Sequence, residues 1–157
     1  MVRGQKISKA DPTTAGDFFA LKDVTFEVRP GEFLAISGKS GAGKTTLVNM
    51  ITGTDHLTAG EVWVGDYSVH RSSEDQRARW RGRNVGVVYQ SFHLLPNISL
   101  IDNVMLPMDF SGTYQPRVSR ARALELLREV ELEQHARKLP SEISGGQQQR
   151  VAIARAL

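Results

Sequence analysis

The stretch G-K-S-G-A-G-K-T at residues 38–45 matches the pattern G-x-x-x-x-G-K-T of a phosphate-binding loop. Such a loop needs a strand before it and a helix after it, because its glycines turn successive backbone N–H groups toward one hollow at a helix N-terminus. The apolar run at residues 32–37 follows a Pro30-Gly31 turn and predicts a buried strand. Residues 45–51 predict the helix, with an apolar face and Gly53 as its stop.

The residue types in this loop suit a nucleoside triphosphate. Lys44 brings a mobile positive charge to the β- and γ-phosphates, and the Thr45 hydroxyl is a suitable Mg²⁺ ligand. A flexible Gly/Ser loop that matches the pattern by chance is the alternative interpretation. The strand and helix patterns on either side of the loop argue against it.

Composition is that of one ordinary globular domain, with 157 residues, 40% hydrophobic and 24% charged. The absence of cysteine excludes disulfides and cysteine-based metal sites, which fits a reducing compartment. No apolar run approaches the length that crosses a bilayer, and residues 1–11 lack the apolar stretch of a signal peptide. We therefore expect a soluble, intracellular protein.

The net charge is +3, and part of the excess lies in residues 71–83, where Trp80 is surrounded by Arg77, Arg79, Arg81 and Arg83. Arginines beside an aromatic ring can hold phosphates and stack a base, which is one interpretation of this segment. A solvated helix is the better one. Ser73 precedes two acidic residues and the arginines follow toward the other end, which is the charge order that a helix dipole favours. Nucleic-acid binding is not expected.

Further elements follow from periodicity. Strands are expected at 21–28, 61–65 and 84–89, the last one ending at Gln90. Ser99 is expected to cap a helix that runs toward Pro107, and residues 119–132 predict an amphipathic helix. A composition shift near residue 91 marks a passage from a mixed α/β part to a helical part.

A second glycine-rich element, S-G-G-Q-Q-Q-R, occupies residues 144–150. Ser144 can cap a helix whose first turn contains Gly145, Gly146 and Gln147, which leaves N–H groups free to bind an anion. Two glycines are poor helix formers, so the close approach of a ligand or of another backbone is a reason for them. Alone, the element is typical of an ordinary junction between a loop and a helix. Together with the phosphate-binding loop, it forms a more specific pattern of two motifs.

On these motifs the chain resembles the nucleotide-binding domain of an ABC transporter. I-S-G-G-Q at residues 143–147 matches the family's signature motif, and Tyr89-Gln90 looks like its Q-loop. The resemblance extends from about Leu21 to Leu157. The segment at residues 93–108 is similar to the subgroup that powers lipoprotein release and macrolide export.

The resemblance implies an α/β fold: a P-loop NTPase core of the ABC type with N-terminal antiparallel β strands and a helical subdomain. Residues 1–90 would form the ATP-binding core and residues 91–157 the helical subdomain, which ends in the signature helix. It implies an ATPase that uses Mg²⁺, with Lys44 and Gln90 as catalytic residues and with Thr45 and Gln90 at the metal. The residues implied to bind ATP are Gly38, Lys39, Ser40, Gly41, Ala42, Gly43, Lys44, Thr45 and Thr46, together with Ser144, Gly145, Gly146 and Gln147.

The implied partners are a second nucleotide-binding domain, in a homodimer with two composite sites, and a transmembrane permease subunit. The implied location is cytoplasmic and peripheral, at the inner face of the cell membrane. A nucleotide-gated regulatory or scaffolding module that moves no solute remains the alternative function. An ABC-like ATPase acting on DNA would need a duplex-binding surface.

Two departures from the family pattern stand out. The family has a Walker B strand ending in Asp-Glu after the signature helix and then a switch histidine, whereas this sequence stops at Leu157; we read it as a fragment, incomplete at its C-terminus, that has no turnover alone. The histidines, His56, His70, His93 and His135, match no switch position.

The second departure concerns the adenine. The family usually stacks an aromatic residue on the base, but the aligned position here is Asp11. Phe18 or Phe19 are candidates to replace it; packing of both rings against the first strands is the favoured alternative.

Overall fold

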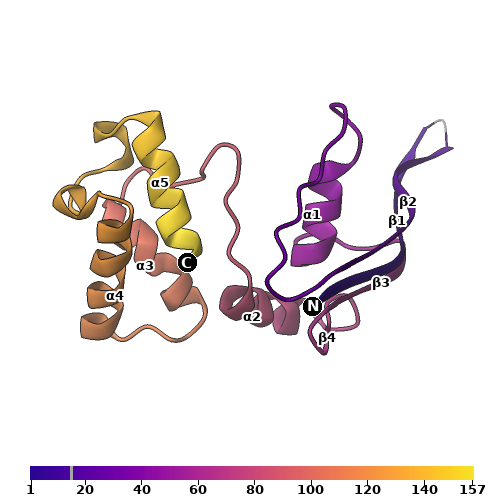
Figure 1. Cartoon of the computed structure of the whole chain (residues 1–157), viewed down its shortest axis with the longest axis horizontal. Coiled ribbons are helices and arrows are strands. Elements are labelled where there is room, and N and C mark those ends of the chain that lie inside the picture. The colour runs from indigo at the N-terminus through magenta and orange to yellow at the C-terminus, as the bar shows by residue number, and fades with distance from the viewer. Residues whose placement is uncertain (15) are drawn as a thin grey trace. The chain divides into compact units, whose positions relative to one another are not determined.

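A computed structural model describes residues 1–14 and 16–157 of the chain (Figure 1). The backbone divides into two compact units, Met1–Ala78 and Arg79–Leu157. The boundary near residue 91 that the sequence predicts, between an α/β ATP-binding core and a helical subdomain, remains a prediction.

An antiparallel sheet in the order β2-β1-β3-β4 is the framework of the first unit. Its strands are β1 (Val2–Thr13), β2 (Gly16–Val28), β3 (Ala59–Val64) and β4 (Tyr67–Ser68). The strands expected at 21–28 and 61–65 are confirmed within β2 and β3. β1 was not predicted, because it is mostly polar; it is a strand because it pairs with neighbours on both sides.

Helix α1 (Lys44–Thr52) follows the phosphate-binding loop, as expected. It ends at Gly53, whose left-handed backbone lets its N–H bond to the carbonyl of Met50. The buried apolar residues of this unit come from the sheet, from α1 and from the segment after β4: Ile7, Leu21, Met50, Val62 and Val69.

The expected strands at 32–37 and 84–89 are wrong. Residues 32–37 and 85–89 belong to no helix or strand, and Asn84 is the last residue of α2 (Glu74–Asn84). Figure 1 shows both segments as plain trace. An apolar run becomes a strand only where a neighbouring strand bonds its backbone, and neither run has such a neighbour among the described residues. Phe33 is consequently 97% exposed.

The second unit is helical. It contains α3 (Leu100–Phe110), α4 (Pro116–Glu129), the short 3₁₀ turns Glu133–His135 and Pro140–Glu142, and α5 (Gly145–Ala156). Ser99 caps α3 by accepting from the Asp102 N–H, as expected, and α3 continues past Pro107. α4 begins and ends three residues before the expected bounds. The core is made by Leu100, Ile101, Val104, Ala123, Leu126, Leu127, Leu132, Ala136, Ile143, Val151 and Ala154.

Helix α2 begins as expected. Ser73 accepts from the Gln76 N–H, and the Gln76 side chain accepts from the Ser73 N–H. The expectation of a solvated arginine is wrong for Arg77, which is only 3% exposed. Its guanidinium contacts Glu74 and lies 2.7 Å from His56 Nε2, so contacts within the first unit offset the cost of burying this charge.

Candidate functional site

The phosphate-binding loop presents a backbone that is ready for an anion. Gly41 and Gly43 have left-handed φ angles of 79° and 81°, and Gly43 is the N-cap of α1. No side chain caps this helix end. Free N–H groups and the positive end of the helix dipole therefore meet at the loop.

Lys44 spans this loop. Its Nζ donates to the carbonyl oxygens of Gly38, at 2.9 Å, and of Lys39, at 2.8 Å. The ammonium thus rests on backbone carbonyls within its own loop, and an incoming phosphate would compete with them for the same charge.

The remaining predicted phosphate ligands lie in the same loop or in the first turn of α1. Lys39, Ser40, Gly41, Ala42 and Thr45 are exposed, and Thr46 is half-buried. Within residues 1–14 and 16–157, no group of three or more histidine, cysteine or acidic side chains could hold a metal ion.

The second glycine-rich element begins α5. The Gln147 N–H donates to Ser144 Oγ at 3.3 Å, and the Ser144 N–H donates to Gln147 Oε1 at 2.9 Å, which closes a capping box. Gly145 and Gly146 are exposed, and a Cβ atom on either would meet nothing within 4 Å. Neither packing nor a positive φ angle requires glycine at these two positions.

Gln90 lies in an exposed turn of the second unit. Tyr89 precedes this turn and His93 follows it, and their rings stack against each other with centroids 4.9 Å apart. Phe92 and His93 are non-glycine residues with left-handed φ angles of 58° and 48°. The backbone after Gln90 therefore has a conformation that residues other than glycine rarely adopt.

Sequence reasoning missed Arg155, in the last turn of α5. Its Nη2 donates to the carbonyl of Phe92 at 2.5 Å, and its Nη1 donates to the carbonyl of His93 at 2.6 Å. Burial holds the pKa of this guanidinium below its ordinary value, although an arginine stays protonated at neutral pH. No periodic pattern or motif could have revealed a contact that joins residues more than sixty positions apart.

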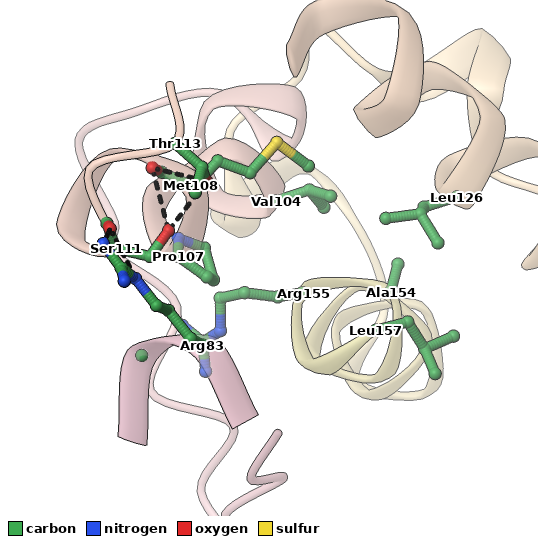
Figure 2. Close-up of a pocket in the computed structure, with 11 residues that line it drawn as sticks. Arg83, Val104, Pro107, Met108, Ser111, Thr113, Leu126, Ala154, Arg155 and Leu157 are labelled. Carbon is green, nitrogen blue, oxygen red and sulfur yellow. Dashed lines mark hydrogen bonds between the residues drawn. The ribbon is translucent and has the colours of Figure 1, made fainter. Parts of the chain in front are cut away.

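The second unit also contains a cavity of about 400 Å³ between α3, α5 and the end of α2 (Figure 2). Arg83 donates to the Ser111 carbonyl at its rim, and Arg155 lines it. Gln90 and the predicted ATP-binding residues 144–147 belong to the second unit, whereas the phosphate-binding loop belongs to the first.

Asp11, Phe18 and Phe19 all lie near the tip of the β1–β2 hairpin, where Asp11 pairs with Phe18 and Ala10 pairs with Phe19. The two rings are 59% and 48% exposed, so the expectation that they pack away against the first strands is wrong.

Residues 21–157 match the family described as ABC transporter. The chain belongs to the ABC transporter family. It is 42% identical, over 98% of its length, to the lipoprotein-releasing system ATP-binding protein LolD of Francisella tularensis subsp. holarctica. It is also 44% identical to the macrolide export ATP-binding/permease protein MacB of Syntrophobacter fumaroxidans. That alignment covers 90% of the chain and 20% of MacB.

Solved structures of this family share the fold. The dimeric ATP-binding cassette MJ0796 bound to ADP and Pi, whose namesake sequence comes from Methanocaldococcus jannaschii, superposes on the whole chain with a TM-score of 0.92 at 39% identity. The chain covers 69% of that structure and 66% of LolD, so it spans about two thirds of these ABC proteins. The α/β fold expected from the resemblance is confirmed. Across the described residues, no helix has the length and apolar character needed to cross a bilayer.

Proposed function

We propose that the chain is the ATP-binding subunit of an ABC transporter and that residues 38–46 bind the phosphates of MgATP. The observation that carries this proposal is the N-terminus of α1: no side chain caps it, the left-handed Gly41 and Gly43 lead into it, and the Lys44 ammonium lies on carbonyls of the same loop. The names of the relatives LolD and MacB, which are ATP-binding proteins, support it.

Within this proposal each residue type has a distinct task. Lys44 releases its two backbone carbonyls and pairs with the β- and γ-phosphates, and the exposed Thr45 hydroxyl supplies a metal ligand. Gln90 approaches the metal or the attacking water and responds to the membrane partner. The bound metal ion would neutralise charge on the phosphates during phosphoryl transfer.

Gly145 and Gly146 point to a second copy of the domain. Their open surroundings leave glycine unexplained within the chain, and glycine in a helix costs about 1 kcal/mol relative to alanine. We propose that Ser144, Gly145, Gly146 and Gln147 approach the γ-phosphate of ATP bound by a second copy, in a two-fold dimer with two composite sites. The dimeric form of the MJ0796 cassette supports this arrangement.

Dimer closure on ATP and reopening after hydrolysis would then drive a transmembrane permease, with this subunit peripheral at the cytoplasmic face of the membrane. We predict that the 157-residue chain alone shows no phosphate release above that of Lys44→Ala, because no Walker B carboxylates occur in it. Steady phosphate release that Lys44→Ala eliminates would contradict this.

Titration calorimetry with MgATP tests the binding proposal. Lys44→Ala should abolish detectable binding, because it removes the charge aimed at the phosphates. Lys39→Ala is the matched control, since it removes an exposed lysine from the same loop; it should only weaken binding. Equal losses of affinity in the two variants would contradict the role assigned to Lys44.

A further inference from the structure

We infer that Arg155 is a positioning residue that ties the loop of Gln90 to helix α5, so that this loop and the Ser144 cap move as one body. The inference rests on the proposed function for its consequence in ATP hydrolysis. Its structural basis lies entirely within the second unit.

The contact is a two-pronged one. The two terminal nitrogens of the guanidinium each donate to one carbonyl, those of Phe92 and His93, at 2.5 Å and 2.6 Å. A planar guanidinium presents its donors in a fixed fork, so it holds two adjacent carbonyls in one relative orientation. Arg155 therefore specifies the direction of the loop as well as its distance from α5.

The backbone that receives these bonds needs such support. Phe92 and His93 are consecutive non-glycine residues in the left-handed region, which is costly for residues with a side chain. A conformation of this kind persists only where surrounding contacts hold it. Arg155 supplies charge-assisted bonds, and the Tyr89–His93 stack supplies the second restraint.

Helix α5 connects this contact to the signature element. Ser144 caps its first turn, and Arg155 lies in its last turn. Val151, Ala152 and Ala154 are buried, which fixes the helix in the core of the unit. A packed helix of this length behaves as a rigid rod, so a displacement of the Gln90 loop that keeps the Arg155 bonds must move the Ser144 end too.

Figure 2 shows the Arg155 side chain leaving α5 beside the cavity that Arg83 also lines. A second contact places the residues just before Gln90 at the same end of α5. A Cβ atom on Gly86 would lie 1.9 Å from the carbonyl oxygen of Ala156, so only glycine fits where this segment passes the end of α5.

The structural test uses NMR on the 157-residue chain. In Arg155→Ala, the amide protons of Phe92 and His93, which bond to the carbonyls of Tyr89 and Ser91, should exchange about tenfold faster or more, because their loop loses its anchor. The ring-current shift that the Tyr89 ring imposes on His93 should collapse at the same time. Arg150→Ala is the matched control, since it removes another arginine from α5 whose nearest acidic partner, Glu131, lies at 3.7 Å.

If Arg155→Ala does not fold, Arg155→Lys replaces it; a single ammonium cannot reproduce the fork, so a smaller change of the same kind is expected. Unchanged exchange rates and an unchanged His93 shift in a folded variant would overturn the inference. This arm requires no nucleotide, so it decides the inference even if the chain binds no ATP.

The functional test uses the full protein in a form that hydrolyses ATP. Arg155→Ala should lower kcat by about tenfold to a hundredfold and leave the KM for ATP within about twofold, because a misplaced loop affects chemistry more than phosphate binding. Adding Arg155→Ala to Gln90→Ala should cause no further loss, since Arg155 acts through that loop. A raised KM with unchanged kcat, or additive losses, would overturn the positioning role. Failure of the wild-type protein to bind ATP would instead count against the proposed function.

Discussion

The carbonyl oxygen of Ala20 in β2 lies 2.5 Å from the point where a Cβ atom would stand on Gly43. The Leu21 side chain lies 3.0 Å from the same point. The phosphate-binding loop is therefore seated directly on the long hairpin. Glycine is required at position 43 for two reasons: its φ angle is 81°, and another backbone approaches closely.

Gly43→Ala should lower the free energy of unfolding by about 2 to 4 kcal/mol, from backbone strain and overpacking together, and should abolish ATP binding. Gly41→Ala is the control, because Gly41 has nearly the same φ angle but nothing within 4 Å of a Cβ atom. It should cost only about 1 to 2 kcal/mol. Urea unfolding curves measure both, and equal losses would show that the Ala20 contact does not matter.

Gly146→Asp should abolish ATP-driven dimerisation in a full-length, catalytically slow protein while leaving the monomer's affinity for ATP nearly unchanged. The carboxylate adds a like charge and a side chain where the partner's γ-phosphate is proposed to approach. Light scattering with and without ATP reports the dimer. Gln149→Asp places the same charge at another exposed position of α5, and it should still dimerise.

Phe18, rather than Phe19, should contact the adenine. Paired residues share a face of a sheet, and so do residues two apart in a strand with no register shift between them. The β1–β2 pairing shifts between Lys9 and Ala10, where β2 carries one extra residue between Leu21 and Phe19, so the faces are counted along β1. Lys9 pairs with Leu21, whose side chain approaches Gly43, and Asp11 pairs with Phe18. Lys9 and Asp11 form an ion pair at 3.6 Å, so Phe18 lies on the face of the phosphate-binding loop.

Phe18→Ala should therefore weaken ATP binding about tenfold, the value of one stacked base, and leave tripolyphosphate binding unchanged. Phe19→Ala is the matched control, because Phe19 pairs with Ala10 on the other face. The assignment would fail if calorimetry showed equal losses for both variants, or a loss of tripolyphosphate binding in Phe18→Ala.

His70 should make the first unit sensitive to acid. Burial lowers the pKa of its imidazole, whose Nε2 lies 2.8 Å from the Met50 carbonyl, and whose Nδ1 is buried with no hydrogen-bond partner among the described residues. The folded-state pKa of His70 lies below its unfolded value of 6.5. The contribution of neutral His70 to the free energy of unfolding is therefore fully present above pH 6.5 and is lost as the pH falls through the folded pKa. Thermal unfolding of wild type and His70→Gln across this range measures the effect. Identical pH dependence in both proteins would remove His70 as its source.

Local chemistry is what the sequence predicted well. The caps at Ser73, Ser99 and Ser144 and the stop at Gly53 bond to backbone groups three or four residues away, so they can be recognised from neighbouring letters. The phosphate-binding loop belongs to the same class, since its glycines, its lysine and the helix that follows are contiguous.

Contacts between distant residues were decided only by the tertiary structure. β1 is a strand because β2 and β3 pair with it, whereas the apolar runs at 32–37 and 85–89 have no such neighbours among the described residues. Arg77 is buried because His56 and Glu74 meet it, and Arg155 reaches carbonyls more than sixty positions earlier in the chain. A short-range hydrogen bond is set by the residues beside it, but burial and strand pairing depend on which distant segment arrives, and no local pattern carries that information.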